Sequence, residues 1–194
     1  MKKIPLTLLF SAVFLLNGCA TTPASDEEIP ELSLPDRRAR DVILADKQLE
    51  AEIQEELADE YDDLLRQCHV NINVYNGAVL VTGEASNEEI RNKIINTIRV
   101  IQGVKRVHDN LAIAYPSDLD SRSNDALITE KIKTALAQIR SLPDFDSAMV
   151  KVVVENATVY LMGMIHRDEG TVVINVVRHQ PDVKQITTVF EYLD

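Results

Sequence analysis

Two stretches of the chain alternate apolar and polar residues with the period of two that a half-buried β-strand requires. In residues 70–83, Val70, Ile72 and Val74 fall on one face, and the alternation resumes after Asn76-Gly77. An Asn-Gly pair readily adopts positive φ at both central positions of a type I′ turn, so this stretch predicts a β-hairpin. Residues 150–163 repeat the pattern, with Asn156 in the place of Asn76. The chain is therefore predicted to be a tandem repeat built on two hairpins.

Apolar residues recur at helical spacing on both sides of each hairpin. In the first repeat, helices are predicted over 41–65 and from a cap at Ser86-Asn87 to Gly103, followed by a strand over 104–113. In the second repeat, a helix from Asp125 to Leu136 precedes the hairpin, a helix ending at Pro181-Asp182 follows it, and a strand covers 183–193. Each repeat thus has the order α-β-β-α-β. Because crossovers within one sheet are right-handed, the third strand should run parallel to the second.

These elements place the chain in the α+β class. We expect two tandem α-β-β-α-β domains, each a three-stranded mixed sheet packed against two helices. The first domain is expected at residues 41–115, a linker at 116–122 and the second domain at 123–194. Domains of this size are near the lower limit for an autonomous core.

The N-terminus has the features of a secretory signal peptide over residues 1–18. Lys2 and Lys3 precede an apolar run that is too short to span a membrane as a helix. The run ends at Leu16-Asn17-Gly18-Cys19, which resembles the lipobox of bacterial lipoproteins and implies cleavage after Gly18 and lipidation of Cys19. Residues 19–40 are expected to form an acidic, flexible tether. Ala20 follows the cysteine, and by resemblance to the enterobacterial sorting rule this favours the outer membrane, with the protein facing the periplasm.

The formal net charge of −11 is concentrated near the N-terminus. Residues 19–65 contain 15 acidic and 4 basic side chains, whereas residues 66–194 are close to neutral. Nucleic acid is not an expected partner, because phosphate binding needs a concentrated basic face.

The sequence carries no pattern typical of an enzyme, a cofactor site or a small-molecule substrate site. Its four histidines, at positions 69, 108, 166 and 179, lack metal-ligand spacing, and no Gly-rich phosphate loop is present. The acidic run Asp59-Glu60-Tyr61-Asp62-Asp63 is expected on a helix, where consecutive carboxylates point in different directions, so a solvated face is the favoured interpretation. No metal and no cofactor are predicted.

The two repeats behind a lipobox resemble the BON-domain proteins. The segments that carry the resemblance most specifically are 123–129 (Ser-Asn-Asp-Ala-Leu-Ile-Thr) and 159–163 (Val-Tyr-Leu-Met-Gly). Among BON-domain proteins, the resemblance is greatest to the outer-membrane lipoproteins with two such domains. It implies a non-enzymatic protein that supports envelope integrity and binds anionic, phosphatidylglycerol-like phospholipid through the first helix of its second domain. One departure is that Leu127 stands where a two-domain lipoprotein of this family has a Trp.

The residues expected to contact lipid on that helix are Leu127, Ile128, Lys131, Lys133 and Thr134. Burying Leu127 is worth roughly 1.5–3 kcal/mol, and each lysine adds about 1 kcal/mol near an anionic surface. The sum of about 4 kcal/mol corresponds to a dissociation constant on the order of millimolar. Such a site needs the Cys19 anchor, which raises the effective concentration of the membrane.

The alternative hypothesis is a periplasmic adaptor that docks on an outer-membrane assembly or a protease complex. An acidic first domain suits this role, since a negative surface is repelled by anionic lipid. Both roles are compatible if the first domain faces protein partners and the second faces lipid.

Overall fold

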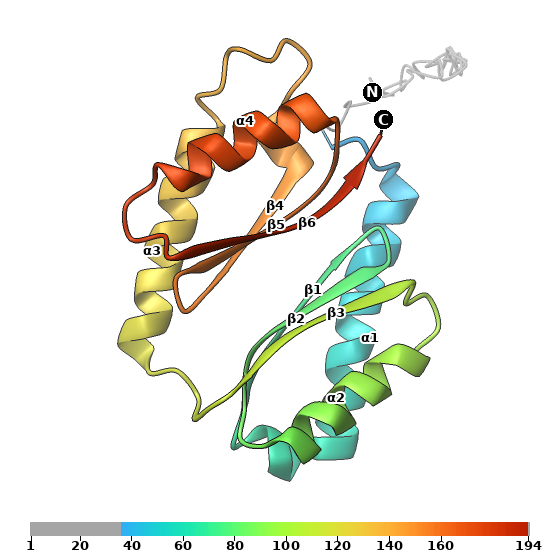
Figure 1. Ribbon diagram of the computed structural model, residues 1–194. Coiled ribbons are helices and arrows are strands. Elements are labelled where there is room, and N and C mark those ends of the chain that lie inside the picture. The colour runs from blue at the N-terminus through green and yellow to red at the C-terminus, as the bar shows by residue number, and fades with distance from the viewer. Residues whose placement is uncertain (1–35, 194) are drawn as a thin grey trace, which may run out of the picture. The chain divides into compact units, whose positions relative to one another are not determined.

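The computed structural model describes residues 36–193, and Figure 1 shows how their helices and strands are arranged. The first repeat comprises α1 (Arg40–Leu65), β1 (His69–Tyr75), β2 (Ala78–Ala85), α2 (Glu88–Val100) and β3 (Arg106–Ile113). The second comprises α3 (Leu119–Leu136), a short 3-10 turn (Ser147–Met149), β4 (Val150–Glu155), β5 (Thr158–Ile165), α4 (Arg167–Arg178) and β6 (Gln185–Tyr192). The predicted α-β-β-α-β order is confirmed in both repeats.

The expected signal peptide, the lipidation site Cys19 and most of the expected tether lie outside the described residues. Among the helices that are described, none combines the length and apolar character needed to cross a membrane.

Each repeat forms its own three-stranded sheet with the hairpin's second strand in the centre. The strand orders are β1-β2-β3 and β4-β5-β6. Within each sheet the first two strands pair antiparallel, and the third pairs parallel to the central strand. The predicted mixed sheet with a parallel third strand is therefore confirmed.

Both hairpins turn on two residues with positive φ, as a type I′ turn requires. In the first hairpin φ is 48° at Asn76 and 74° at Gly77, and in the second it is 50° at Asn156 and 62° at Ala157. The second turn thus places an alanine where the first has glycine. Positive φ at an alanine costs roughly 1–2 kcal/mol.

An aspartate on the first helix of each repeat holds these turns. The carboxylate of Asp46 on α1 accepts hydrogen bonds from the backbone N–H groups of Asn76 at 2.6 Å and Gly77 at 2.8 Å. Asp125 on α3 accepts the equivalent pair from Asn156 and Ala157, both at 2.8 Å. Both aspartates are buried. The backbone groups that a tight turn exposes are thereby satisfied from the helix, which fixes the helix against the hairpin.

The helices of each repeat bury one face of their own sheet (Figure 1). The first core contains residues of α1, α2 and all three strands: Leu49, Ile53, Leu57, Ile72, Val74, Val79, Val81, Ile90, Ile94, Ile95, Ile98 and Leu111. Cys68 is half-buried and packs against this cluster, as expected for a small apolar side chain. The second core has the equivalent composition around Ile128, Ile132, Val159 and Val173.

The structure differs from the sequence prediction at the start of α3. Residues 119–122, expected in the linker, form the first turn of the helix. The cause is Asp118, whose side chain accepts a hydrogen bond from the N–H of Ser121 at 2.8 Å and caps the helix seven residues before Asp125.

The second difference lies at the end of the first hairpin, which the sequence predicts at Gly83. β2 continues to Ala85, because Glu84 and Ala85 pair with Ala112 and Ile113 of the parallel strand β3. Gly83 has φ of 108°, and a Cβ at this position would lie 2.0 Å from the carbonyl oxygen of His69. The close approach of the His69 backbone therefore requires glycine at this position.

Candidate functional site

The residues predicted to contact lipid lie on α3, and the structure separates them into two sets. Leu127 is 61% exposed, and Thr134 is exposed. At about 100° per residue, Thr134 lies on the same side of the helix as Leu127. Ile128, by contrast, is fully buried at 0% exposure within the core of the second domain. The inclusion of Ile128 in a lipid-contacting set was wrong, because the sheet covers its side chain.

The two predicted lysines are exposed, but each lies beside an acidic group. The Nζ of Lys131 is 3.0 Å from the carboxylate of Asp182 in the loop after α4. The Nζ of Lys133 is 3.7 Å from the carboxylate of Glu130 on the same helix. Exposed pairs of this kind contribute about 0–1 kcal/mol and exchange readily with other counterions. In the structure as it stands, however, the two lysines add little net positive charge to the surface.

Two exposed apolar residues near the start of α3 were missed. Leu119 is 71% exposed on the first turn of α3, and Tyr115 is 91% exposed in the segment before it. Leu119 lies within roughly 80° of Leu127 around the helix. We call the set Leu119, Leu127, Lys131 and Thr134 the outer surface of α3. The signal that could have found Leu119 was Asp118, a helix-capping residue that extends the helix back to it.

The acidic face of α1 is solvent-exposed, as predicted. Its exposed carboxylates include Glu52, Glu55, Glu56, Asp59 and Glu60. The helix has a kink at Tyr61, whose φ of −132° and ψ of 23° are not helical. The Tyr61 hydroxyl donates to Glu60 at 2.6 Å and lies 3.0 Å from Thr97 Oγ1 of α2.

The sheet faces that the helices leave uncovered contact each other. A third apolar cluster joins Tyr75 and Leu80 of the first sheet to Tyr160 and Met162 of the second. The Tyr75 hydroxyl accepts a hydrogen bond from the backbone N–H of Met164 at 3.2 Å. Burial raises the pKa of Tyr75 to about 12. The phenol therefore stays protonated near neutral pH, and it lies 3.4 Å from the carbonyl oxygen of Met149, to which it donates.

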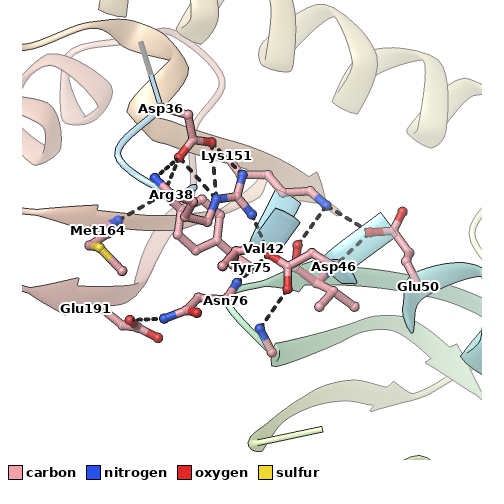
Figure 2. A network of polar contacts seen from close by, with 12 residues as sticks. Asp36, Arg38, Val42, Asp46, Glu50, Tyr75, Asn76, Lys151, Met164 and Glu191 are labelled. Atoms are coloured by element: carbon pink, nitrogen blue, oxygen red, sulfur yellow. Dashed lines mark hydrogen bonds and ion pairs between the residues drawn. The ribbon is translucent and has the colours of Figure 1, made fainter. Parts of the chain in front are cut away.

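Figure 2 shows the polar network at one edge of this contact. The guanidinium of Arg38 lies 3.6 Å over the ring of Tyr75 and pairs with Asp36 and Asp46, each at 2.6 Å. Two further bonds cross between the repeats: Asn76 donates to Glu191 at 2.7 Å, and Lys151 pairs with Glu50 at 3.0 Å.

Arg37, which lies between Asp36 and Arg38 in the sequence, contacts the second repeat. Arg37 makes a two-pronged ion pair with Glu169 in the first turn of α4, with both N···O distances 2.6 Å. It also donates to the carbonyl oxygen of Met164 at 3.3 Å. The Arg37 hydrogen bond lowers the pKa of the Glu169 carboxyl. The segment 36–38 thus fixes the start of α1 to the second domain.

A cluster of metal-ligating side chains lies at another part of the contact between the repeats. His69 of β1, Glu84 of β2 and Glu155 of β4 place their ligand atoms within 4.8 Å of one another. Both glutamates are buried. Burial raises the pKa of Glu155, while a hydrogen bond from Asn71 and the nearby His69 lower it. The spacing of histidines along the chain predicted no metal site. Glu84 meets His69 through the pairing of β1 with β2, and Glu155 meets it only where the two repeats are in contact.

The two repeats correspond to two matches of one known domain family. The BON domain matches residues 45–115 and residues 124–194, and the chain belongs to the BON-domain family. Over 194 residues it is 24% identical to the Outer membrane lipoprotein DolP of Haemophilus influenzae, covering 100% of this chain and 97% of that protein.

Two further similarities cover less of the chain. The chain is 25% identical over 130 residues to a 21 kDa hemolysin of Actinobacillus pleuropneumoniae, covering 67% of this chain and 66% of that protein. The C-terminal domain of CdsD, a structural protein of the Type III secretion system of Chlamydia trachomatis, aligns with 72% of this chain and 98% of its own at 12% identity. Its TM-score of 0.31 is too low to support a conclusion about function.

Proposed function

We propose that this protein is an outer-membrane lipoprotein whose second BON domain binds the phospholipid bilayer through the outer surface of α3. The role is one of binding and supports envelope integrity; no enzymatic activity is proposed. Residues 1–18 would be removed as a signal peptide, Cys19 would carry the lipid anchor, and the residues between Cys19 and the fixed segment 36–38 would form the tether. The two domains would be 41–115 and 123–194, with residues 119–122 added to the second as the first turn of α3. Similarity over the full length to a protein named Outer membrane lipoprotein DolP supports the anchored, periplasm-facing location.

The observation that carries the lipid-binding proposal is the exposure of Leu119 and Leu127 on one side of a single helix. Large apolar side chains that project from a well-packed helix are typical of an interfacial contact. Transferring each leucine from water is worth roughly 1.5–3 kcal/mol. Two leucines together correspond to a dissociation constant between about millimolar and tens of micromolar.

The preference for anionic lipid depends on the two lysines. Lys131 and Lys133 contribute to binding only if phosphate groups displace Asp182 and Glu130 from them. Because such exposed pairs are weak, a phosphatidylglycerol surface can compete for the lysines at low ionic strength. We therefore expect anionic vesicles to bind more strongly than neutral ones, and the difference to shrink at physiological salt.

The test is flotation of residues 20–194, which contain the whole compact unit, with phosphatidylglycerol-containing and with neutral vesicles. Leu127→Asp should reduce the bound fraction by about tenfold or more, since it removes roughly 1.5–3 kcal/mol of transfer free energy. Val100→Asp is the matched control, because Val100 is also an exposed apolar helix residue but lies in the first domain. Equal flotation of the two variants would exclude α3 as the lipid-binding surface. No flotation of the parent protein at low salt would exclude lipid binding by the protein without its anchor.

The second candidate function is a protein-binding adaptor that docks on an outer-membrane assembly or a protease complex. The observation that favours it is the exposed acidic face of α1, defined by Glu52, Glu55, Glu56, Asp59 and Glu60. A basic partner surface would complement this charge. Replacing Glu52, Glu56 and Asp59 with their amides should then weaken capture of such a partner, whereas Leu127→Asp should leave capture unchanged.

A further inference from the structure

A second polar cluster joins the two repeats. It is separate from the network around Arg38, and two of its three residues are buried. His69 and Glu84 belong to the first repeat, and Glu155 belongs to the second. The Nδ1 of His69 lies 3.3 Å from an Oε2 of Glu84 and 3.4 Å from Oε1 of Glu155. One imidazole nitrogen therefore faces two carboxylates at nearly equal distances.

Hydrogen bonds hold one oxygen of Glu155 and both oxygens of Glu84. Asn71 of the first repeat donates to Oε2 of Glu155 at 2.7 Å, and Asn156 of the second repeat donates to Oε1 of Glu84. The backbone N–H of Ser117 donates to Oε2 of Glu84 at 3.0 Å. Hydrogen bonds of this kind orient carboxylates that ligate metal ions.

One oxygen of the cluster remains unsatisfied. Oε1 of Glu155 is buried and accepts no hydrogen bond from the described residues. The residue is 5% exposed, and the neighbouring polar atom on this side is Nδ1 of His69, at 3.4 Å. A buried acceptor without a partner costs about 1–3 kcal/mol, and more when it is charged. Its place beside His69 and Glu84 indicates that a cation belongs between the three groups.

Two of the three ligand separations fit a tetrahedral ion of the size of Zn²⁺, and the third lies within 4.8 Å. Zinc binds histidine nitrogen and carboxylate oxygen at about 2.0–2.2 Å, so two ligand atoms on neighbouring corners of the tetrahedron lie about 3.3–3.6 Å apart. The two measured separations from His69 Nδ1 fall in this range. The hydroxyl oxygen of Ser117 lies 3.3 Å from the same nitrogen and is available near a fourth position.

The cluster can be reached from solvent. An open pocket is lined by His69, Asn71 and Glu155 together with Arg122, Asp125 and Thr129 of α3. This provides an entry path for a hydrated ion, which a metal site requires.

We propose that His69, Glu84 and Glu155 form a binding site for a divalent transition-metal ion of the Zn²⁺ type. The ion links the two BON domains, because it takes two ligands from the first and one from the second. Its role is structural: bound metal stabilises the contact between the two sheets. This site is independent of the proposed lipid-binding surface, since it shares no residue with the outer surface of α3.

The experiment is titration of the chelator-treated full-length protein, in mild detergent, with ZnCl₂ by calorimetry, together with its thermal unfolding. We expect a single high-affinity Zn²⁺ per chain and a rise in Tm with zinc concentration, because a ligand that binds only the folded state stabilises it. Glu155→Gln and His69→Gln should each lower the affinity at least about tenfold, a typical loss for a disrupted metal site. Co²⁺ should give the strong visible absorption of a tetrahedral complex in the parent protein alone.

Glu191→Gln is the matched control, because Glu191 also accepts an inter-repeat hydrogen bond from an asparagine but lies outside the cluster. Glu155→Gln removes a charge without changing shape, so the metal-free variant should unfold at or above the parent's Tm while losing the zinc-induced rise. If the parent shows no zinc-dependent shift, or if Glu155→Gln binds zinc as the parent does, the proposal is wrong. In the latter case zinc binds elsewhere on this acidic chain.

Discussion

The two hairpin turns show how the same backbone is built from different residues. Gly77 and Ala157 occupy equivalent positions with φ of 74° and 62°, and each N–H donates to an aspartate of the preceding helix. Their surroundings differ. A Cβ at Gly77 would lie 2.9 Å from Cγ of Lys105 and 3.0 Å from the carbonyl oxygen of Gly103, whereas the Cβ of Ala157 packs in the core of the second domain.

This difference predicts unequal changes in stability on substitution at the two positions. Gly77→Ala should destabilise the protein by about 1–2 kcal/mol, because it adds the cost of positive φ to a close contact. Ala157→Gly should change the stability by less than about 1 kcal/mol, because relief of the positive φ offsets the loss of about 0.8 kcal/mol from a buried methyl group. Urea unfolding of both variants measures this, and equal losses would show that the two turns do not differ in strain.

At the scale of elements, the position of α3 was only partly predictable. Its core-facing residues Ile128, Ile132 and Leu136 follow from helical periodicity, and all three are buried. The first turn was missed because residues 116–122 have the composition of a linker, while the cap at Asp118 extends the helix over them. For the same reason, the sequence did not predict that Leu119 belongs to the proposed lipid-binding surface.

The pairing of Lys131 with Asp182 could not be predicted either. These residues are 51 positions apart and meet only because α3 packs beside the end of α4. The sequence therefore overstated the positive charge of the helix. In the structure, the exposed leucines are therefore expected to contribute more to the free energy of lipid binding than the paired lysines.

The ion pair between Arg37, before α1, and Glu169, in the first turn of α4, predicts that the stability of the protein depends on pH. The Arg37 hydrogen bond holds the pKa of the Glu169 carboxyl below its ordinary value of about 4.3. The unfolded chain therefore binds this proton more readily than the folded one. The stabilisation is fully present above about pH 4.3 and is lost as the pH falls through the depressed pKa.

Glu169→Gln should accordingly cost about 1.5–3 kcal/mol at pH 7, the range for hydrogen bonds to charged groups. The difference from the parent protein should shrink towards zero as the pH falls well below about 4. Urea unfolding at neutral and acid pH measures both values, with Glu130→Gln as an exposed control that should change little. A difference that is the same at both pH values would contradict an ionic contribution from Arg37.

At the scale of the whole molecule, the two repeats are joined by the faces of their sheets. Tyr75, Leu80, Tyr160 and Met162 are all buried in this contact. The amide of Met164 in the second repeat donates to the hydroxyl of Tyr75 in the first. A change in one repeat should therefore be detectable in the other.

Leu80→Ala should destabilise the protein by about 2–5 kcal/mol, as expected for a fully buried leucine. It should also accelerate hydrogen exchange at the Met164 amide, since a looser contact frees that N–H from Tyr75. Nuclear magnetic resonance measures the exchange rate, and Val100→Ala, at an exposed position, is the control. An unchanged rate at Met164 in Leu80→Ala would mean that the second repeat holds this amide without the first.

The sequence by itself determined the repeat, the order of elements, the parallel third strand and the core-facing positions. These features follow from local patterns: the alternation around Asn76, the helical spacing of the isoleucines, and the handedness of crossovers. The resemblance to BON-domain proteins rests on the same local patterns, and the match of the BON domain to both repeats confirms it.

The tertiary structure alone decided which polar residues meet. The cluster of His69, Glu84 and Glu155, the pair of Arg37 with Glu169, and the bond from Asn76 to Glu191 each join residues of different repeats. No period or spacing along the chain encodes these pairs, because they depend on how one sheet lies on the other. The alternation of residues along a strand predicts which side chains point away from the core of its own domain. What those side chains contact depends on how the two sheets pack against each other.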